Sequence, residues 1–143
     1  MHTLRLPYST LSPQAYQGLI DCKNALQESS LGKDLLELIY LRISQMNGCA
    51  FCLDLHTSSL RKSGVSNKKI DTLAGWRVSN HFSPKEQVAL AWAESLVNIH
   101  HSYAPDHLFN PLKQHFTDTE ISDLTIAVSL MSAFNRLAIG LRQ

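Results

Sequence analysis

The sequence has little excess charge of either sign, no long apolar run and few cysteines, and each shortage excludes a class of protein. Its 13 basic and 12 acidic residues give a formal net charge of +1, too small a field to attract nucleic acid or anionic lipid. The most apolar run, Leu124–Phe134, has 11 residues, whereas a membrane span needs about 20. We therefore expect no nucleic-acid partner and no membrane partner, and we assign this run to a core helix.

The amino terminus also lacks the features of an exported protein. MHTLRLPYSTLSPQ contains no continuous apolar stretch of the kind found in secretory signals. The cysteines are only three, Cys22, Cys49 and Cys52, and an odd number without an export signal is atypical of a disulfide-stapled secreted scaffold. These features predict a cytoplasmic protein whose close cysteine pair serves metal binding or thiol chemistry.

Helix signals run through most of the chain. Ser12-Pro13 is typical of a helix start, and apolar residues at helical spacing continue to about Ser29. The segment Lys33–Met46 is apolar around most of its circumference, which predicts a central helix. That helix should end at Asn47-Gly48, a pair typical of turns and helix C-termini.

Four further helices are predicted after this turn. One runs from Cys49 or Ala50 to about Lys62, and a shorter one covers residues 67–75. Capping boxes at Ser83–Glu86 and Thr117–Glu120 open two more, the second continuing toward the C-terminus. No alternating strand pattern bounded by hairpin turns is present. We therefore expect a single all-α domain over residues 1–143, a bundle of about seven helices with the cysteine pair at the N-terminus of a central helix.

The stretch NGCAFCLDLH places two cysteines and a histidine at the start of the third predicted helix. Cys49 and Cys52 would lie on one face with Cβ atoms about 5 Å apart, close to disulfide geometry. Unpaired N–H groups and the helix dipole at this end favour the thiolate form. His56 follows Cys52 by four residues and shares its stripe, where an imidazole can act as a base toward the thiol.

Glu37, on the preceding predicted helix, is the fourth candidate. If Asn47-Gly48 turns the chain into a helical hairpin, Glu37 lies about 16 Å back from the turn and His56 about 12 Å forward, at ~1.5 Å per residue. The two side chains are then at similar depth, and a carboxylate in an apolar helix needs such a partner. The predicted arrangement is Cys52 as nucleophile, His56 as base and Glu37 as the group that orients the base.

Other interpretations of these residues stay open at this stage. Glu37 could be a solvated position and His56 a structural residue. The cysteine pair could be half of a zinc site, but Cys22 stands alone and His100-His101 are adjacent, so a second ligand pair at the usual spacing is missing. We therefore expect no metal. A thioredoxin-like fold would need a βαβ pattern that this chain lacks.

The remaining candidates receive structural assignments. Tyr40 and Ser44 follow Glu37 at helical spacing and are predicted to support the same pocket. Cys22 is predicted to be a buried apolar position and not a third catalytic thiol. The other aromatic and histidine residues are assigned to core or subunit contacts (Trp76, Phe82, Trp92) and to the surface (His81, His100, His101, His107, His115).

The stretch ELIYLRISQMNGCAFCLDLH, in which Glu37 lies twelve residues before Cys49, resembles the core motif of the alkylhydroperoxidase D-like, carboxymuconolactone decarboxylase superfamily. LAGWRVSNHFSPKEQVALAWAESL and FNRLAIGLRQ are similar to segments of its small single-module members, so the resemblance extends from about Leu4 to the end. It implies an all-helical fold that assembles as homotrimers or homohexamers, and a CxxC-dependent peroxidase activity.

The resemblance also implies a role for each motif residue. Cys52 matches the peroxidatic cysteine, Cys49 the resolving cysteine, and His56 with Glu37 the proton relay. No cofactor is implied beyond the redox-active Cys49–Cys52 disulfide, and the implied reductant is a lipoylated or thioredoxin-like protein. The sequence departs from the family pattern at Phe51, where well-understood members have a histidine, so any lateral proton path through this position is absent here.

Together these features predict a thiol-dependent alkyl hydroperoxide reductase with an antioxidant role and a hydroperoxide substrate. Two alternatives remain. The protein could be a helical oligomer in which the pair is a redox sensor or has no catalytic function. It could also be a decarboxylase-like lyase that uses Glu37 and His56 as acid and base, although the decarboxylase branch of the superfamily lacks the cysteine pair.

Overall fold

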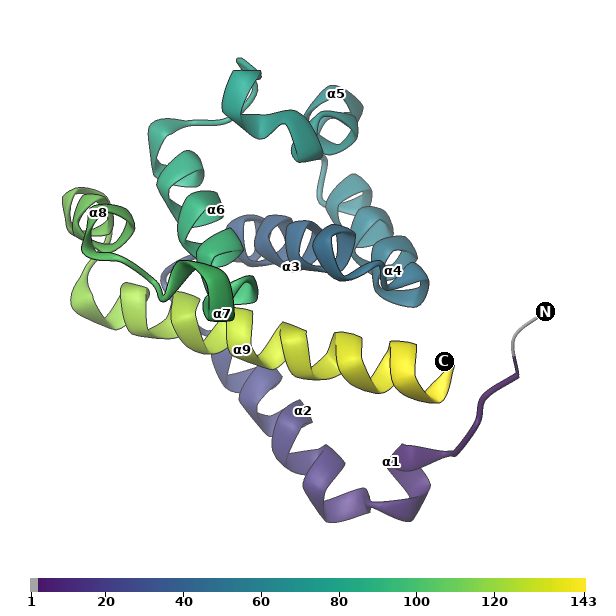
Figure 1. Ribbon diagram of the computed structural model, residues 1–143. Helices are drawn as coiled ribbons and strands as arrows, with labels where there is room; N and C mark the ends of the chain where they lie inside the picture. The colour runs from purple at the N-terminus through teal and green to yellow at the C-terminus, as the bar shows by residue number, and fades with distance from the viewer. Residues whose placement is uncertain (1–2) are drawn as a thin grey trace.

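The computed structural model describes residues 3–143 and contains no strand in that range (Figure 1). The predicted all-α class is confirmed. The elements are α1 (Tyr8–Leu11), α2 (Pro13–Gln27), α3 (Lys33–Asn47), α4 (Ala50–Lys62), α5 (Asn67–Asp71), η1 (Leu73–Val78), α6 (Pro84–Val97), α7 (Ile99–Ser102), α8 (Asp106–Phe109), η2 (Asn110–Gln114) and α9 (Asp118–Leu141), where η denotes a 3-10 helix.

The structure has more helices than the seven or so expected, because the short ones carry no periodic signal. Helices α1, α7 and α8 have 4 residues each, barely one turn, which is too short for an apolar stripe to repeat. The helix predicted over 67–75 is divided into α5 and η1. The long helices, which position the site, begin within about one residue of the predicted starts.

Helix α3 is the centre of the fold, as its all-round apolar pattern predicts. It packs against α4, α6 and α9, and Leu38, Ile39, Leu41 and Ile43 are each no more than 1% exposed. Burying one such side chain contributes roughly 1.5–3 kcal/mol. A helix held on three sides in this way is a rigid support for any side chain that projects from its fourth side.

Helix α9 is the longest, with 24 residues. By length and mean hydropathy alone it could cross a membrane. The sequence did not predict this, because the continuous apolar run within this helix has only 11 residues. In the structure it crosses the bundle and packs against α2, α3, α4 and α6, burying residues along one face (Figure 1). It therefore serves as a core helix.

The predicted start and stop signals are found where the sequence placed them. Ser83 and Glu86 form a reciprocal capping box at the start of α6, and Thr117 and Glu120 form another at the start of α9. Helix α3 ends at Gly48, which has a left-handed backbone with φ 69° and ψ 37°. That turn directs the chain back as α4 against α3, and so makes the hairpin on which the site depends.

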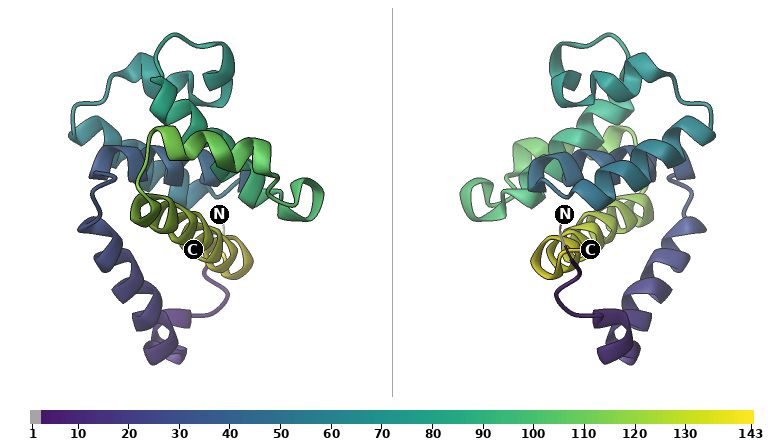
Figure 2. Two further views of the ribbon diagram at one scale, coloured as in Figure 1. Left: turned by 90° about the vertical axis from the view of Figure 1, so that its left-hand side faces the viewer. Right: turned by 90° about the vertical axis from the view of Figure 1, so that its right-hand side faces the viewer.

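The two ends of the described chain lie together (Figure 2). The N–H of Arg5 donates to the Leu141 carbonyl at 2.7 Å, its guanidinium donates to the Gly140 carbonyl at 3.1 Å, and the Tyr8 hydroxyl donates to the side-chain oxygen of Gln143. We refer to residues 4–11 as the N-terminal strap. It is fastened to the C-terminal end of α9 beside the motif helix α4.

The structural assignments of the other candidates are mostly confirmed. Trp76, Phe82 and Trp92 are buried in the core. His81, His100, His101 and His107 are exposed, whereas His115 is only half-exposed. Cys22 is half-buried rather than buried, because α2 buries only Leu26 completely and otherwise lies along the edge of the bundle.

Candidate active site

The cysteine pair occupies the first turn of α4. Cys49 is the N-cap residue, and its sulfur accepts a hydrogen bond from the N–H of Cys52 at 3.4 Å. The two cysteines are joined by a disulfide with their Cα atoms 5.3 Å apart. Both are buried, Cys49 at 1% and Cys52 at 4% exposure. The pair can therefore cycle between dithiol and disulfide within one helical turn.

His56 and Glu37 are brought together by the α3–α4 hairpin. Nδ1 of His56 lies 2.7 Å from Oε2 of Glu37, and their side chains are only 5% and 15% exposed. Because an ionised carboxylate only accepts hydrogen bonds, Nδ1 is the donor. Nε2 of a neutral His56 is then left unprotonated, which is the form that a general base requires.

Tyr40 packs behind His56, with the ring centroids 5.4 Å apart. Burial, and next the Glu37 charge, raise the pKa of the Tyr40 hydroxyl far above its usual range, so this residue remains a neutral phenol. Its ring packs against the imidazole and so limits the orientations that His56 can adopt. The structure places Tyr40 beside His56, and its supporting role stays a prediction.

Ser44 does not line the cavity that Cys52 and His56 share, and its hydroxyl bonds to α9. Its hydroxyl donates to the Tyr40 carbonyl at 2.7 Å and accepts from the Asn135 amide at 3.1 Å. The side-chain oxygen of Asn135 in turn accepts from Asn47 at 3.0 Å. Ser44 thus helps to join the end of α3 to α9, a structural contact that helical spacing alone did not indicate.

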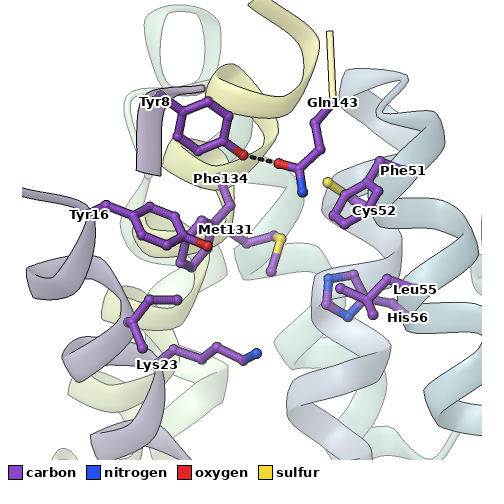
Figure 3. A pocket seen from close by; sticks show the side chains of 11 residues that line it. Tyr8, Tyr16, Lys23, Phe51, Cys52, Leu55, His56, Met131, Phe134 and Gln143 are labelled. Atoms are coloured by element: carbon purple, nitrogen blue, oxygen red, sulfur yellow. Dashed lines mark hydrogen bonds between the residues drawn. The ribbon is translucent and has the colours of Figure 1, made fainter. Parts of the chain in front are cut away.

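A cavity of about 160 Å³ opens onto the motif (Figure 3). Its walls come from α4, from α2, from α9 and from the two chain ends. The lining residues are Phe51, Cys52, Leu55 and His56 of α4, Tyr16, Ile20 and Lys23 of α2, Met131 and Phe134 of α9, and Tyr8 and Gln143. Cys52 and His56 share one wall of this cavity, whereas Cys49 is not among the residues that line it. Cys52 is therefore the sulfur that a small molecule in the cavity meets first.

Sequence reasoning missed most of the other walls of this cavity. Tyr16, Ile20 and Lys23 are spaced by four and three residues on α2, so they form a helical stripe that was visible in the sequence. Nothing in the sequence indicated that this stripe faces α4. Phe51 lies at the cavity and is 42% exposed, so the position that carries a histidine in the resembled motif is apolar here.

Metal-binding geometry is not found in the part of the chain that the structure describes. Over residues 3–143, no three His, Cys, Asp or Glu side chains come together as a cluster that could hold an ion. Cys22, the third cysteine, is not among the residues that line the cavity around Cys52. The chemistry available at the cavity is thus that of one accessible sulfur, its neighbouring sulfur and a carboxylate-bound imidazole.

Known proteins resemble this chain in sequence and in structure. An uncharacterised protein of Bacillus subtilis, YdfG, is 33% identical over 137 residues, which cover 96% of this chain and 93% of YdfG. A crystal structure of a protein of unknown function from Agrobacterium tumefaciens, described as a candidate antioxidant defence protein AhpD, superposes with a TM-score of 0.94. That structure is 35% identical, and the match covers 99% of this chain and 97% of the other.

A shorter similarity links about a third of the chain to a named enzyme. The alkyl hydroperoxide reductase AhpD of Rhizorhabdus wittichii is 41% identical over 51 residues, which are 36% of this chain and 30% of that protein. The family model described as the carboxymuconolactone decarboxylase family matches residues 13–95, a segment that contains Glu37, Cys49, Cys52 and His56. The chain therefore belongs to the carboxymuconolactone decarboxylase family, within the alkylhydroperoxidase D-like superfamily.

Proposed function

We propose that this protein is a thiol-dependent reductase of organic hydroperoxides with an antioxidant role. One observation carries the proposal. Cys52 is bonded to Cys49 and also faces a cavity that it shares with His56, whose other ring nitrogen is held by Glu37. A peroxidatic sulfur needs access to the oxidant, a base that removes its proton, and a second thiol that reacts with its oxidised form. The cavity, His56 and Cys49 would supply these three requirements.

The first step is attack of the Cys52 thiolate on the O–O bond of the bound hydroperoxide. His56 takes the thiol proton at Nε2, and Glu37 stabilises the imidazolium that forms. The S–O bond forms as the O–O bond breaks, so Cys52 becomes a sulfenic acid. The leaving alkoxide takes the proton from His56 and departs as the alcohol.

The second step is condensation between the two cysteines. The Cys49 thiol attacks the sulfenic acid on Cys52, forming the 49–52 disulfide and releasing water. With Cα atoms 5.3 Å apart, the pair closes within the first turn of α4, which limits further oxidation of Cys52. An external dithiol then returns two electrons and two protons by thiol–disulfide exchange. We propose a lipoylated or thioredoxin-like protein as this reductant, and no further cofactor.

The comparisons support the proposal at the level of the family. Three proteins named alkyl hydroperoxide reductase AhpD match this chain. The same family also has the decarboxylase name, which is why a lyase that uses Glu37 and His56 stays the alternative enzyme. A redox-sensing or non-catalytic oligomer is the alternative without turnover.

We also propose that the protein works as a homotrimer or homohexamer in the cytoplasm. Leu6 and Leu11 on the strap and Phe51 and Leu55 on the motif helix are between 42% and 62% exposed. Exposed apolar side chains of this kind are what a subunit interface would cover. Light scattering or analytical ultracentrifugation measures the assembly directly.

The proposed function is tested by counting thiols before and after one equivalent of cumene hydroperoxide. The reduced protein should lose two thiols per chain. Trypsin would release Cys49 and Cys52 together in residues 43–61, and Cys22 separately in residues 6–23. The first peptide alone should lose the mass of two hydrogen atoms under non-reducing conditions.

Cysteine variants separate the three hypotheses. Cys52→Ser should abolish peroxide consumption, Cys49→Ser should stop after one sulfenic acid that dimedone traps, and Cys22→Ser is the matched control that should keep full activity. Peroxide consumption by Cys52→Ser would refute the proposal. Disulfide formation without repeated turnover in the presence of a dithiol would favour a sensor. Lactone decarboxylation that survives loss of both cysteines would favour the lyase.

A further inference from the structure

Lys23 is a cation in a cavity whose other side chains carry no permanent charge. Eleven residues line this cavity, and most of the side chains other than Lys23 are apolar or aromatic. It extends from α2 toward the opposite wall, where Cys52 and His56 lie (Figure 3). Lys23 is half-buried, and an ammonium that faces such walls can bind an anion through a charge-assisted hydrogen bond.

No protein carboxylate is paired with this ammonium in residues 3–143. The ion pairs of the described chain join other residues. Glu37, which lines a second cavity together with Lys23, is already bonded to His56. Asp21, on the same helix, accepts from Gln17. An anionic group on a molecule in the cavity could therefore pair with the Lys23 ammonium.

We propose that Lys23 is a specificity-determining residue that binds an anionic group, such as a carboxylate, on the hydroperoxide substrate. This inference rests on the proposed function, because it names the substrate class for the same site. The cavity volume of about 160 Å³ resembles that of a protein cavity of about 150 Å³ known to hold benzene. The preferred substrate then has an apolar body of about this size, its O–O bond near Cys52 and its anion toward α2.

The test uses two hydroperoxides that differ only in charge: cumene hydroperoxide and its para-carboxylate. The rate constant for oxidation of the Cys49–Cys52 pair is measured by stopped flow for each. In the wild-type protein the carboxylate should react about tenfold faster, the effect expected from one charge-assisted hydrogen bond in a partly exposed site. Lys23→Met keeps the side-chain length without the charge and should bring the ratio close to one, mainly by slowing the carboxylate.

Two further variants make the result specific. Lys23→Arg retains the charge and should keep much of the preference. Lys62→Met removes an exposed charge at the end of α4 and should leave the ratio unchanged. An equal ratio in the wild-type protein and Lys23→Met would overturn the inference, as would slower reaction of the carboxylate in the wild-type protein.

A binding measurement decides the inference if neither hydroperoxide oxidises the pair, which would refute the proposed function itself. The redox-inert alcohols, 2-phenyl-2-propanol and its para-carboxylate, are titrated into the wild-type protein and Lys23→Met and followed by NMR. Tighter binding of the carboxylate, about tenfold and only in the wild-type protein, would support an anion site at Lys23. Equal affinity of the carboxylate for both proteins would refute it.

Discussion

The carboxylate of Glu37 lies 2.7 Å from Nδ1 of His56, although the two residues are 19 positions apart in the chain. The contact joins α3 to α4 across the turn at Gly48, so the candidate base is positioned by the most deeply packed helix of the fold. The orientation of the imidazole near Cys52 therefore depends on α3 as much as on α4.

Replacing Glu37 by Gln should slow oxidation of the cysteine pair by about 10²-fold, within the usual range for loss of general acid–base assistance. The amide keeps the size of the side chain but removes the charge that stabilises the imidazolium. Stopped-flow measurement of the first oxidation step checks this expectation. Glu28→Gln, an exposed residue of the neighbouring cavity, is the control and should react at the wild-type rate. An unchanged rate in Glu37→Gln would contradict the relay.

Replacing Gly48 by Ala should reduce the free energy of unfolding by about 1–2 kcal/mol, the cost of a left-handed backbone for a residue with a Cβ atom. Gly18→Ala, within α2, should instead increase it by about 0.5–1 kcal/mol. A Cβ atom would meet nothing within 4 Å at either position. Of these two glycines, Gly48 has a positive φ, of 69°, and Gly18 does not. Denaturant unfolding of both variants would reveal the opposite signs. The same sign for both would show that backbone conformation does not decide the effect.

The hairpin could be predicted from the sequence because its determinants are local. Asn47-Gly48 marks the turn, the rise per residue fixes the depth of Glu37 and His56, and the apolar circumference of Lys33–Met46 identifies the central helix. Capping boxes predicted the starts of α6 and α9 for the same reason, since each depends on four consecutive residues.

The cavity could not be predicted in the same way, because three helices and both chain ends form it. Lys23 belongs to a recognisable stripe on α2, but the face that this stripe meets is decided by how α2 packs on α9. Tyr8 and Gln143 meet only when the fold brings the two ends together. Contacts between distant segments leave no periodic signal in one sequence.

Ionisation of Glu94 makes the free energy of unfolding depend on pH. Burial opposes its ionisation, but hydrogen bonds from Arg77, Trp76 and Arg42 outweigh burial and lower the pKa of this carboxyl. The ionised form is therefore favoured in the folded state. Its contribution is fully present above the unfolded pKa of about 4.3 and is lost as pH falls through the lower folded pKa.

Glu94→Gln should therefore reduce the free energy of unfolding near pH 7 by about 1–3 kcal/mol, the usual cost of leaving a buried polar partner unsatisfied. The difference from wild type should shrink as the pH falls below about 4. Urea unfolding at a series of pH values measures both effects. Asp71→Asn, whose exposed carboxylate lies 3.9 Å from Arg61, is the control and should change stability by less than about 0.5 kcal/mol. A pH-independent cost for Glu94→Gln would contradict the assigned role of ionisation.

Replacing Tyr8 by Phe should make Cys52 easier to reach. The ring keeps its edge contact with Tyr16, at 5.7 Å between centroids, but loses the hydrogen bond that fastens the strap to Gln143. A bulky maleimide should then modify reduced Cys52 faster, while small iodoacetamide should show little change. Tyr103→Phe, at a side chain that is 80% exposed, provides the comparison. Equal maleimide rates in wild type and Tyr8→Phe would mean that the strap does not limit access.

The reacting side chains and the chain ends that enclose the cavity belong to separate segments of the sequence, so substitutions can alter one set without altering the other. Glu37, Cys49, Cys52 and His56 lie on one hairpin, whereas Tyr8 and Gln143, at opposite ends of the chain, close the space in front of it. If the proposed function holds, exchanging the terminal segments between relatives should change which peroxide reacts fastest while the sulfur chemistry stays the same. Selectivity would then diversify without any change to the residues that react.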